Sequence, residues 1–424
     1  MKIIRISFLF AGLFIWMCHP VFSQQISNTD KTYDENIVTV LLHANGNQMQ
    51  APVIELGSNE KLELSFDDLS NQYYLFHYTF VHCTSDWKTS DLDPIDYIDG
   101  YFEGDIKNYK FSFNTITPYI HYDLVFPTDE MRIKLSGNYI LKVYVDDGSG
   151  TQTIITRRFY VTETQANISA RVSPRPKNVD FLHKKQQIDL QIHTQNIFGD
   201  EPEQRFKVNI RQDGRWDNMK TGLHPTSVNQ NTLYFDFPDG IVFDGGNEAR
   251  FFDMKTYRYL SESISRIVQG QNYYNVTLHT DYPRKGKPYE TYKTIRGQEL
   301  ITARNDQDPM LEGDYALVHF SLKSTKFQQA SVYLMGALTQ WNIETEGKMT
   351  YNNKSRQYEG QLFLKQGYYE YWYVVVPDGM QKGDVTKVEG DHWETTHSYT
   401  VYLYYHHRMP EYDQLLGTQE ISAH

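Results

Sequence analysis

The chain has 424 residues, of which 15% are aromatic, and its 41 Lys and Arg against 53 Asp and Glu give a net charge of −12. The length suggests about three domains. The acidic balance, with no basic stripe, excludes nucleic acid as a partner, because a polyanion binder needs clustered positive charge.

Residues 1–23 predict a secretory signal peptide. Two basic residues precede an almost wholly apolar stretch, residues 6–18, which is too short to span a bilayer. We expect cleavage between Ser23 and Gln24. Cys18 leaves lipoprotein processing as an alternative, although Met17 is a poor match to the residue that such processing needs. No later stretch is long enough for a membrane span, so we expect an exported chain without one.

Cleavage at that point would leave Cys83 as the sole cysteine, so no intramolecular disulfide can form. Cys83 ends an alternating apolar run, which favours a buried, inert thiol over a reactive one. Residues 24–35, which follow the signal peptide, are polar and aperiodic and predict a flexible leader.

The rest of the chain shows short strand patterns separated by turns. Aromatic and β-branched residues alternate with polar ones, and Gly, Pro, Asn and Asp recur between the runs. No segment keeps helical apolar spacing for three turns. The pattern predicts three tandem antiparallel β-sandwiches of the Ig-like or early-set type. Their expected boundaries are residues 36–164, 165–304 and 305–424.

No motif for catalysis or cofactor binding occurs in the sequence. Nucleophile elbows, P-loops, dinucleotide fingerprints and paired Cys motifs are lacking, so we expect neither an enzyme nor a cofactor. Glu389, Asp391, His392, Glu394 and His397, with two histidines further on, could ligate zinc. Their separation along a loop and a strand favours hydrogen bonding in the loop, and we expect no metal.

An aromatic-rich stretch follows Cys83 without strand alternation. It contains Trp87, Tyr97, Tyr101 and Phe102, and it predicts an ordered loop. Rigid aromatic side chains are common anchors of protein interfaces. These four residues are therefore candidates for a partner interface, and the alternative is that they cap the end of a sandwich.

Residues 35–163 resemble the N-terminal domain of the type IX secretion system plug protein of Bacteroidota. The resemblance rests on motifs in the same order as in that domain, at residues 64–69 (LSFDDL), 82–87 (HCTSDW), 97–100 (YIDG), 111–115 (FSFNT), 119–122 (YIHY) and 135–141 (LSGNYIL). Residues 389–395 (EGDHWET) and the tyrosines after them resemble the end of such proteins.

This resemblance implies a periplasmic plug without chemistry of its own. Such a subunit docks on the large outer-membrane translocon barrel, at the inner face of the outer membrane. It closes the periplasmic opening of the barrel while no substrate passes. The sequence gives no expectation for the docking surface or for the role of the middle domain.

A second resemblance supports an alternative function. Residues 332–342 and 367–373 are similar to the early-set sandwich of glycogen-binding modules, in which Trp341 would match a sugar-stacking residue. The second platform Trp of such modules is missing after Asp378 and Gly379. The alternative is an exported glycan-binding protein, and a glycoside-processing enzyme with carboxylates in a domain cleft is a third possibility.

Overall fold

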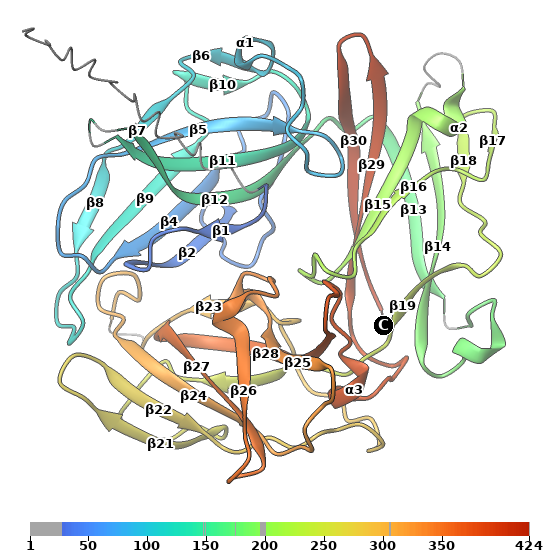
Figure 1. Cartoon of the computed structure of the whole chain (residues 1–424). Coiled ribbons are helices and arrows are strands. Elements are labelled where there is room, and N and C mark those ends of the chain that lie inside the picture. The colour runs from blue at the N-terminus through green and yellow to red at the C-terminus, as the bar shows by residue number, and fades with distance from the viewer. Residues whose placement is uncertain are drawn as a thin grey trace, which may run out of the picture.

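The structure is a computed structural model that describes residues 28–423 except 147, 149, 174, 196–200, 305 and 306. The expected signal peptide, its cleavage point and residues 24–27 lie outside the described residues. Most strands pair antiparallel and each α-helix is a single turn, which confirms the all-β prediction. Figure 1 shows the strands gathered into sandwich-like units. Within the described ranges, no helix is long and apolar enough to cross a membrane.

The first unit packs two sheets around one core. One sheet has the order β1-β12-β11-β5-β7, with β3 alongside β12, and the other has the order β2-β4-β9-β8. A small β6–β10 pair and the helix α1 close one end. The bounds are β1 (Lys31–Thr32), β2 (Ile37–Ala44), β3 (Val53–Glu55), β4 (Leu62–Asp68), β5 (Phe76–Cys83), α1 (Pro94–Tyr97), β6 (Ile98–Gly100), β7 (Gly104–Ile106), β8 (Asn108–Phe111), β9 (Ile120–Phe126), β10 (Met131–Ile133), β11 (Gly137–Asp146) and β12 (Thr151–Thr162).

Two details of this unit bear on the expectations from sequence. Side chains of β5 alternate between buried and half-buried, and Cys83 is fully buried, as expected. Burial raises the pKa of its thiol to about 12. Residues 24–35 were expected to form a flexible leader, but Lys31 and Thr32 form β1. This strand pairs with β12, and its side chains are half-buried.

The second unit also packs two sheets. One has the order β13-β14-β18-β17 with β19 alongside β14, and the other has the order β16-β15-β29-β30. The two sheets share one core. The bounds are β13 (Ala166–Ser173), η1 (Val179–Phe181), β14 (Lys185–Thr194), α2 (Pro202–Arg205), β15 (Phe206–Gln212), β16 (Lys220–Leu223), β17 (Ser227–Asn229), β18 (Thr232–Tyr234), β19 (Ile241–Asp244), β29 (Ser398–Arg408) and β30 (Glu411–Ser422).

The third unit is one sheet in the order β20-β28-β25-β26-β27-β24-β22-β21, with β23 alongside β28. Its two halves bury their side chains in the same core, so the sheet folds back on itself as a sandwich. The bounds are β20 (Arg250–Asp253), β21 (Ile264–Gln269), β22 (Tyr274–Leu278), β23 (Glu299–Ile301), β24 (Tyr315–Leu322), β25 (Ala330–Met335), η2 (Ala337–Thr339), η3 (Thr345–Gly347), β26 (Lys348–Asn352), β27 (Gln357–Lys365), β28 (Gly367–Pro377) and α3 (Thr386–Glu389).

Strand pairing divides the chain differently from the expected boundary at residues 304 and 305. β20 to β23 lie before that boundary and pair within the third unit, whereas β29 and β30 lie after it and belong to the second. β15 pairs with β29 from Phe206 opposite Tyr405 to Gln212 opposite Tyr399. The third unit is thus inserted between β19 and β29, and the three units are not simply in tandem. A strand's local pattern does not reveal a partner almost two hundred residues away.

Candidate functional site

The four candidate interface residues separate into two buried and two exposed side chains. Trp87 and Tyr97 are buried, whereas Tyr101 is 68% exposed and Phe102 45% exposed. Tyr97 packs in the core of the first unit and donates a hydrogen bond to the Phe80 carbonyl at 3.3 Å. Of the four, only Tyr101 and Phe102 are available to a partner.

Trp87 lies at the junction of the first and second units. Its ring meets Tyr160 of the first unit and Trp216 of the second edge-on, with centroids 5.2 and 5.6 Å apart. Tyr160 in turn stacks on Tyr402 at 4.4 Å. A hydrogen bond from Ser85 N to Asp413 Oδ2 (2.8 Å) completes the contact. Trp87 therefore joins two units of this chain.

The candidate sugar-stacking residue, Trp341, is buried as well. Its ring packs on Trp372, with centroids 6.1 Å apart, and against the backbone of Gly214 and Gly297. A Cβ on Gly297, which has φ +74°, would lie 2.6 Å from the Trp341 ring. Only glycine permits this close approach. The indole joins the second and third units. Its remaining 8% of exposed surface lies in the wall of a cavity between the units, so it is not the open surface platform of a sugar-stacking residue.

The carboxylates and histidines near the C-terminus point to different partners, and no cluster in the described ranges could hold a metal ion. Glu389 forms ion pairs with Arg250 and Arg284, at 3.0 and 2.8 Å. His406 contacts Asp413 at 3.0 Å.

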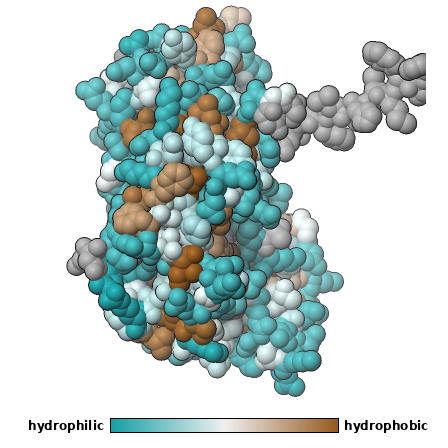
Figure 2. All heavy atoms as spheres, turned by 90° about the vertical axis from the view of Figure 1, so that its left-hand side faces the viewer, coloured by the Kyte–Doolittle hydropathy of each residue, from teal (hydrophilic) through white to brown (hydrophobic). Residues whose placement is uncertain are grey.

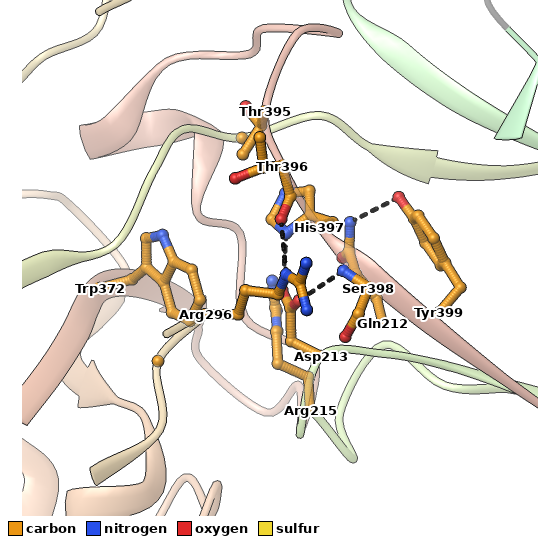
Figure 3. A network of polar contacts seen from close by, with 12 residues as sticks. Gln212, Asp213, Arg215, Arg296, Trp372, Thr395, Thr396, His397, Ser398 and Tyr399 are labelled. Carbon is orange, nitrogen blue, oxygen red and sulfur yellow. Dashed lines mark hydrogen bonds and ion pairs between the residues drawn. The ribbon is translucent and has the colours of Figure 1, made fainter. Parts of the chain in front are cut away.

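His397 instead connects the two segments by which the chain leaves and re-enters the second unit. Gly245 follows β19 on the way to the third unit, and His397 precedes β29 on the way back. Its Nδ1 lies 2.6 Å from Asp213 Oδ2 and its Nε2 lies 2.8 Å from the Gly245 carbonyl. Both partners are acceptors, so both ring nitrogens must donate. Burial alone would lower the pKa of His397, but Asp213 and the Gly245 carbonyl raise it above its ordinary value. Figure 3 shows this network, with Arg296 donating to the Thr396 carbonyl beside it.

A buried ion pair connects the first and third units. Lys365 Nζ lies 2.6 Å from Asp67 Oδ2, and both side chains are almost fully buried. The Tyr315 hydroxyl donates to the same oxygen at 2.6 Å, and His121 Nδ1 lies 2.6 Å from Oδ1. Burial opposes ionisation of Asp67, yet the Lys365 ammonium and His121 hold the pKa of that carboxyl below its usual range.

Each unit therefore contacts both of the others through buried polar groups or aromatic rings. The sequence predicted three sandwiches in a row and did not predict these contacts between them. Three junctions of this kind hold the units as one block, because relative motion would expose buried charges and rings to water.

An apolar surface on the outside of the block lies on the first unit. It consists of exposed side chains before β5 and along β8, and we call it the aromatic surface: Tyr73, Tyr74, Leu75, Tyr109, Phe111 and Phe113. The rings of Tyr73 and Tyr109 lie 4.8 Å apart, and Tyr109 and Phe111 lie 6.0 Å apart. Figure 2 faces the side of the molecule where β8 lies and shows hydrophobic side chains there among hydrophilic ones. An exposed cluster of this kind marks an interaction site.

The aromatic surface is held rigidly. The Phe113 amide donates to the Leu311 carbonyl of the third unit at 3.1 Å. The amides of Ile116 and Thr117 donate to Asp314 Oδ1, at 2.7 and 3.2 Å. β8 is also an edge strand, and within the described residues no strand pairs with its outer side. A partner would therefore meet fixed rings beside free backbone groups.

Sequence patterns did not identify this surface. Tyr109 and Phe111 alternate with polar residues in a way that predicts a half-buried strand, yet all residues of β8 are exposed. The strand lies at the edge of its sheet, beyond the part that the opposite sheet covers. The FSFNT motif was the one signal that fell in this region.

Comparisons with known proteins agree with this fold. The family model described as type 9 secretion system plug protein, first domain, matches residues 37–163. A crystal structure of a hypothetical protein from Parabacteroides merdae is 34% identical, with a TM-score of 0.90, and the match covers 94% of this chain and all of that one. The C-terminal domain of the Streptococcus pyogenes antigen I/II-family protein AspA is 7% identical over 91% of this chain and 98% of its own, with a TM-score of only 0.17.

No curated protein matches the chain. The first-domain match contains the aromatic surface and the motifs between residues 64 and 141 that indicated the plug resemblance. The P. merdae structure matches 94% of the chain, so the likeness to that protein includes the second and third units. The chain therefore belongs to the family of type 9 secretion system plug proteins, which is a family of secretion components and not one of enzymes.

Proposed function

We propose that this protein is a periplasmic plug subunit that docks on the outer-membrane translocon barrel of the type IX system and closes its periplasmic opening when no substrate passes. The observation that carries the proposal is the family match over residues 37–163. Membership indicates a role in type IX secretion and a location in the periplasm or envelope. The barrel as partner and closure as the action are the proposed steps.

The construction of the molecule supports such a role. A closure subunit must span a wide aqueous opening without bending. The buried Asp67–Lys365 pair joins the first and third units, and the hydrogen bond from Arg215 to the Gly383 carbonyl joins the second and third. A stable interface buries about 1,200–2,000 Å² in total. A rigid block can supply such an area without the entropy cost of ordering flexible segments.

The aromatic surface is the part of the block that we assign to docking. Its rings are exposed before a partner binds, and the backbone contacts of residues 113–117 with the third unit fix their positions. Preorganised aromatic anchors contribute about 1–3 kcal/mol each when an interface buries them. Tyr101 and Phe102 remain secondary candidates because they are exposed on the same unit.

Co-purification tests the proposal. Tagged wild-type protein and the variant Tyr109→Ser/Phe111→Ser/Phe113→Ser are recovered from detergent-solubilised outer membranes of the native cells. The matched control is Tyr259→Ser/Leu260→Ser, which removes two exposed apolar residues from the third unit. Thermal midpoints of all three proteins are measured in parallel.

We expect a very large barrel protein to accompany the wild type and the control, and to be lost with the triple variant at an unchanged midpoint. Absence of any barrel protein from the wild-type eluate would contradict docking. If the triple variant recovers as much barrel protein as the wild type does, the docking site is not the aromatic surface.

The glycan-binding alternative is not supported by the position of Trp341. A stacking platform needs an open ring face, and the Trp341 ring is covered by Trp372 and two glycines. No second candidate function is proposed.

A further inference from the structure

A cavity of about 500 Å³ lies where the three units meet. The first unit contributes Arg157 and Tyr160 to its walls, the second Arg211 and Trp216, and the third Trp341. Its volume falls within the range of about 300–1,000 Å³ that is typical of small-molecule sites. The aromatic surface is formed by other residues, so this cavity is separate from the proposed docking site.

Most charged groups of the cavity wall are satisfied within the protein. Arg157 donates to the Lys31 carbonyl at 3.0 Å and to Thr32 Oγ1 at 3.1 Å. Arg296 faces Glu420 at 3.8 Å, and Asp213 is held by His397.

Arg158 is also satisfied, through hydrogen bonding and stacking. Its Nε donates to the Asn28 carbonyl at 2.8 Å. Its guanidinium lies between the rings of Trp87 and Trp216, with Cζ 4.7 and 4.1 Å from the two centroids.

Two charged groups of the wall are exceptions, namely Glu299, whose pKa is raised by burial, and Arg211. Within the described residues its guanidinium has no hydrogen bond and no ion pair, and Nε is buried without a partner. One face of the group lies over Trp216, with Cζ 4.4 Å from the ring centroid, which holds the guanidinium in place at the cavity wall. The side chain as a whole is half-buried, and Asp30 of the same wall favours its charge while accepting a hydrogen bond from the Arg158 amide. The buried Nε–H still lacks an acceptor, and such a donor is costly unless a bound group supplies one. Stacking fixes the plane of the guanidinium but leaves its N–H groups free.

We propose that this cavity binds a carboxylate carried on an apolar or aromatic body, with the carboxylate on Arg211 and the body against Trp216 and Trp341. A planar guanidinium matches a carboxylate with two parallel hydrogen bonds, which lysine cannot reproduce. The aromatic walls suit a flat or apolar remainder. The carboxylate can belong to a free acid or to the end of a peptide, and the experiment separates the two.

The proposal is tested by titration calorimetry on the full-length protein. Benzoate represents a free acid, a short peptide ending in Phe represents a peptide carboxyl end, and the C-terminal amide of that peptide lacks the charge. Inorganic phosphate serves as a non-carboxylate anion. We expect saturable binding of benzoate or of the peptide acid, and weaker binding of the amide and of phosphate.

Three variants locate the site. Arg211→Met removes the guanidinium and should weaken binding at least about tenfold, whereas Arg211→Lys keeps the charge but not the fork and should weaken it less. Arg171→Met, at an exposed arginine of the second unit, is the matched control and should bind as the wild type does. Benzoate should also raise the thermal midpoint of the wild type but not that of Arg211→Met.

Two results would overturn the proposal. One is that neither carboxylate probe binds the wild type. The other is that a probe binds the wild type, the Arg211→Lys variant and a folded Arg211→Met variant with equal affinity. That result would place the binding site away from Arg211. If Arg211→Met fails to fold, the comparison of wild type with Arg211→Lys decides.

Discussion

At the scale of single residues, His397 determines how the stability of the molecule depends on pH. Its two ring nitrogens face Asp213 Oδ2 and the Gly245 carbonyl, so the protonated ring satisfies both acceptors. The pKa of His397 is raised in the folded protein, because these acceptors outweigh the effect of burial. The protonated ring therefore stabilises the fold at low pH. That contribution is complete below the unfolded pKa and is lost as pH rises through the folded pKa.

We expect His397→Ala to lower the free energy of unfolding by about 3–5 kcal/mol at about pH 6, because it leaves the Asp213 carboxylate buried without its cation. The difference from wild type should be smaller at about pH 9 than at about pH 6, because the proton that stabilises the folded ring is lost progressively as pH rises. Urea denaturation at both pH values checks this. His193→Ala, at an exposed histidine, is the control. A His397→Ala deficit that grows with pH would contradict the assignment.

Glu299 affects the stability of the folded protein only in the pH range where its carboxyl group titrates. It lines the cavity, and burial raises its pKa to about 7 although Arg157 lowers it. An acid with a raised pKa destabilises the folded protein as pH rises from its unfolded value to its folded one.

Glu299→Gln should therefore stabilise the protein by about 1–3 kcal/mol at about pH 8 and have little effect at about pH 5. Thermal midpoints at the two pH values test this, with the exposed Glu203→Gln as control. An equal effect at both pH values would show that ionisation of Glu299 is not the cause.

Two residues show why site prediction from sequence was incomplete. Trp87 and Trp341 lie in loops rich in aromatic residues, and such loops look the same whether they face a solvent-exposed partner or a neighbouring unit. The structure places both at junctions within the chain. Burial of Cys83, by contrast, followed from local alternation alone, and that prediction is confirmed.

At the scale of elements, the C-terminal hairpin β29–β30 completes the second unit. β15 pairs with β29, and Tyr399, Val401, Leu403 and Tyr405 from the hairpin are buried in the second core. Strand positions and the fold class could be predicted from alternation and turn residues. The pairing of β15 with β29 could not, because the local pattern of a strand fits several partners equally well.

A fragment of residues 165–304 should therefore fail to fold, since it lacks two strands of its sheet. A matched chimera that joins residues 165–246 to residues 397–423 through a Gly-Ser linker should fold. Circular dichroism and dispersion of amide NMR signals distinguish the two outcomes. A folded 165–304 fragment would contradict the insertion of the third unit.

At the scale of the whole molecule, the three junctions make the units interdependent. The Asp67–Lys365 pair is an almost fully buried contact between the first and third units, and Tyr315 and His121 complete its hydrogen bonding. The sequence placed these residues in separate domains and gave no sign that they meet. Contacts between units depend on how the units are arranged in space, and strand patterns do not encode that arrangement.

Asp67→Asn should lower the free energy of unfolding by about 3–5 kcal/mol, because it leaves the Lys365 ammonium buried without a counter-charge. The control Asp99→Asn removes an exposed partner of Arg132 and should cost about 0–1 kcal/mol. Urea denaturation followed by tryptophan fluorescence measures both. Equal losses for the two variants would contradict a structural role of the buried pair.

Closure of a large barrel is the central claim, and uptake of a bulky hydrophilic fluorophore across the outer membrane tests it most directly. Cells that keep the barrel but lack this protein should admit the fluorophore. Wild-type protein and the Tyr259→Ser/Leu260→Ser control should restore exclusion, and the Tyr109→Ser/Phe111→Ser/Phe113→Ser variant, present at equal level in the periplasm, should not. If cells that lack the protein exclude the fluorophore as well as wild-type cells do while the barrel remains in the membrane, the protein does not act as a plug.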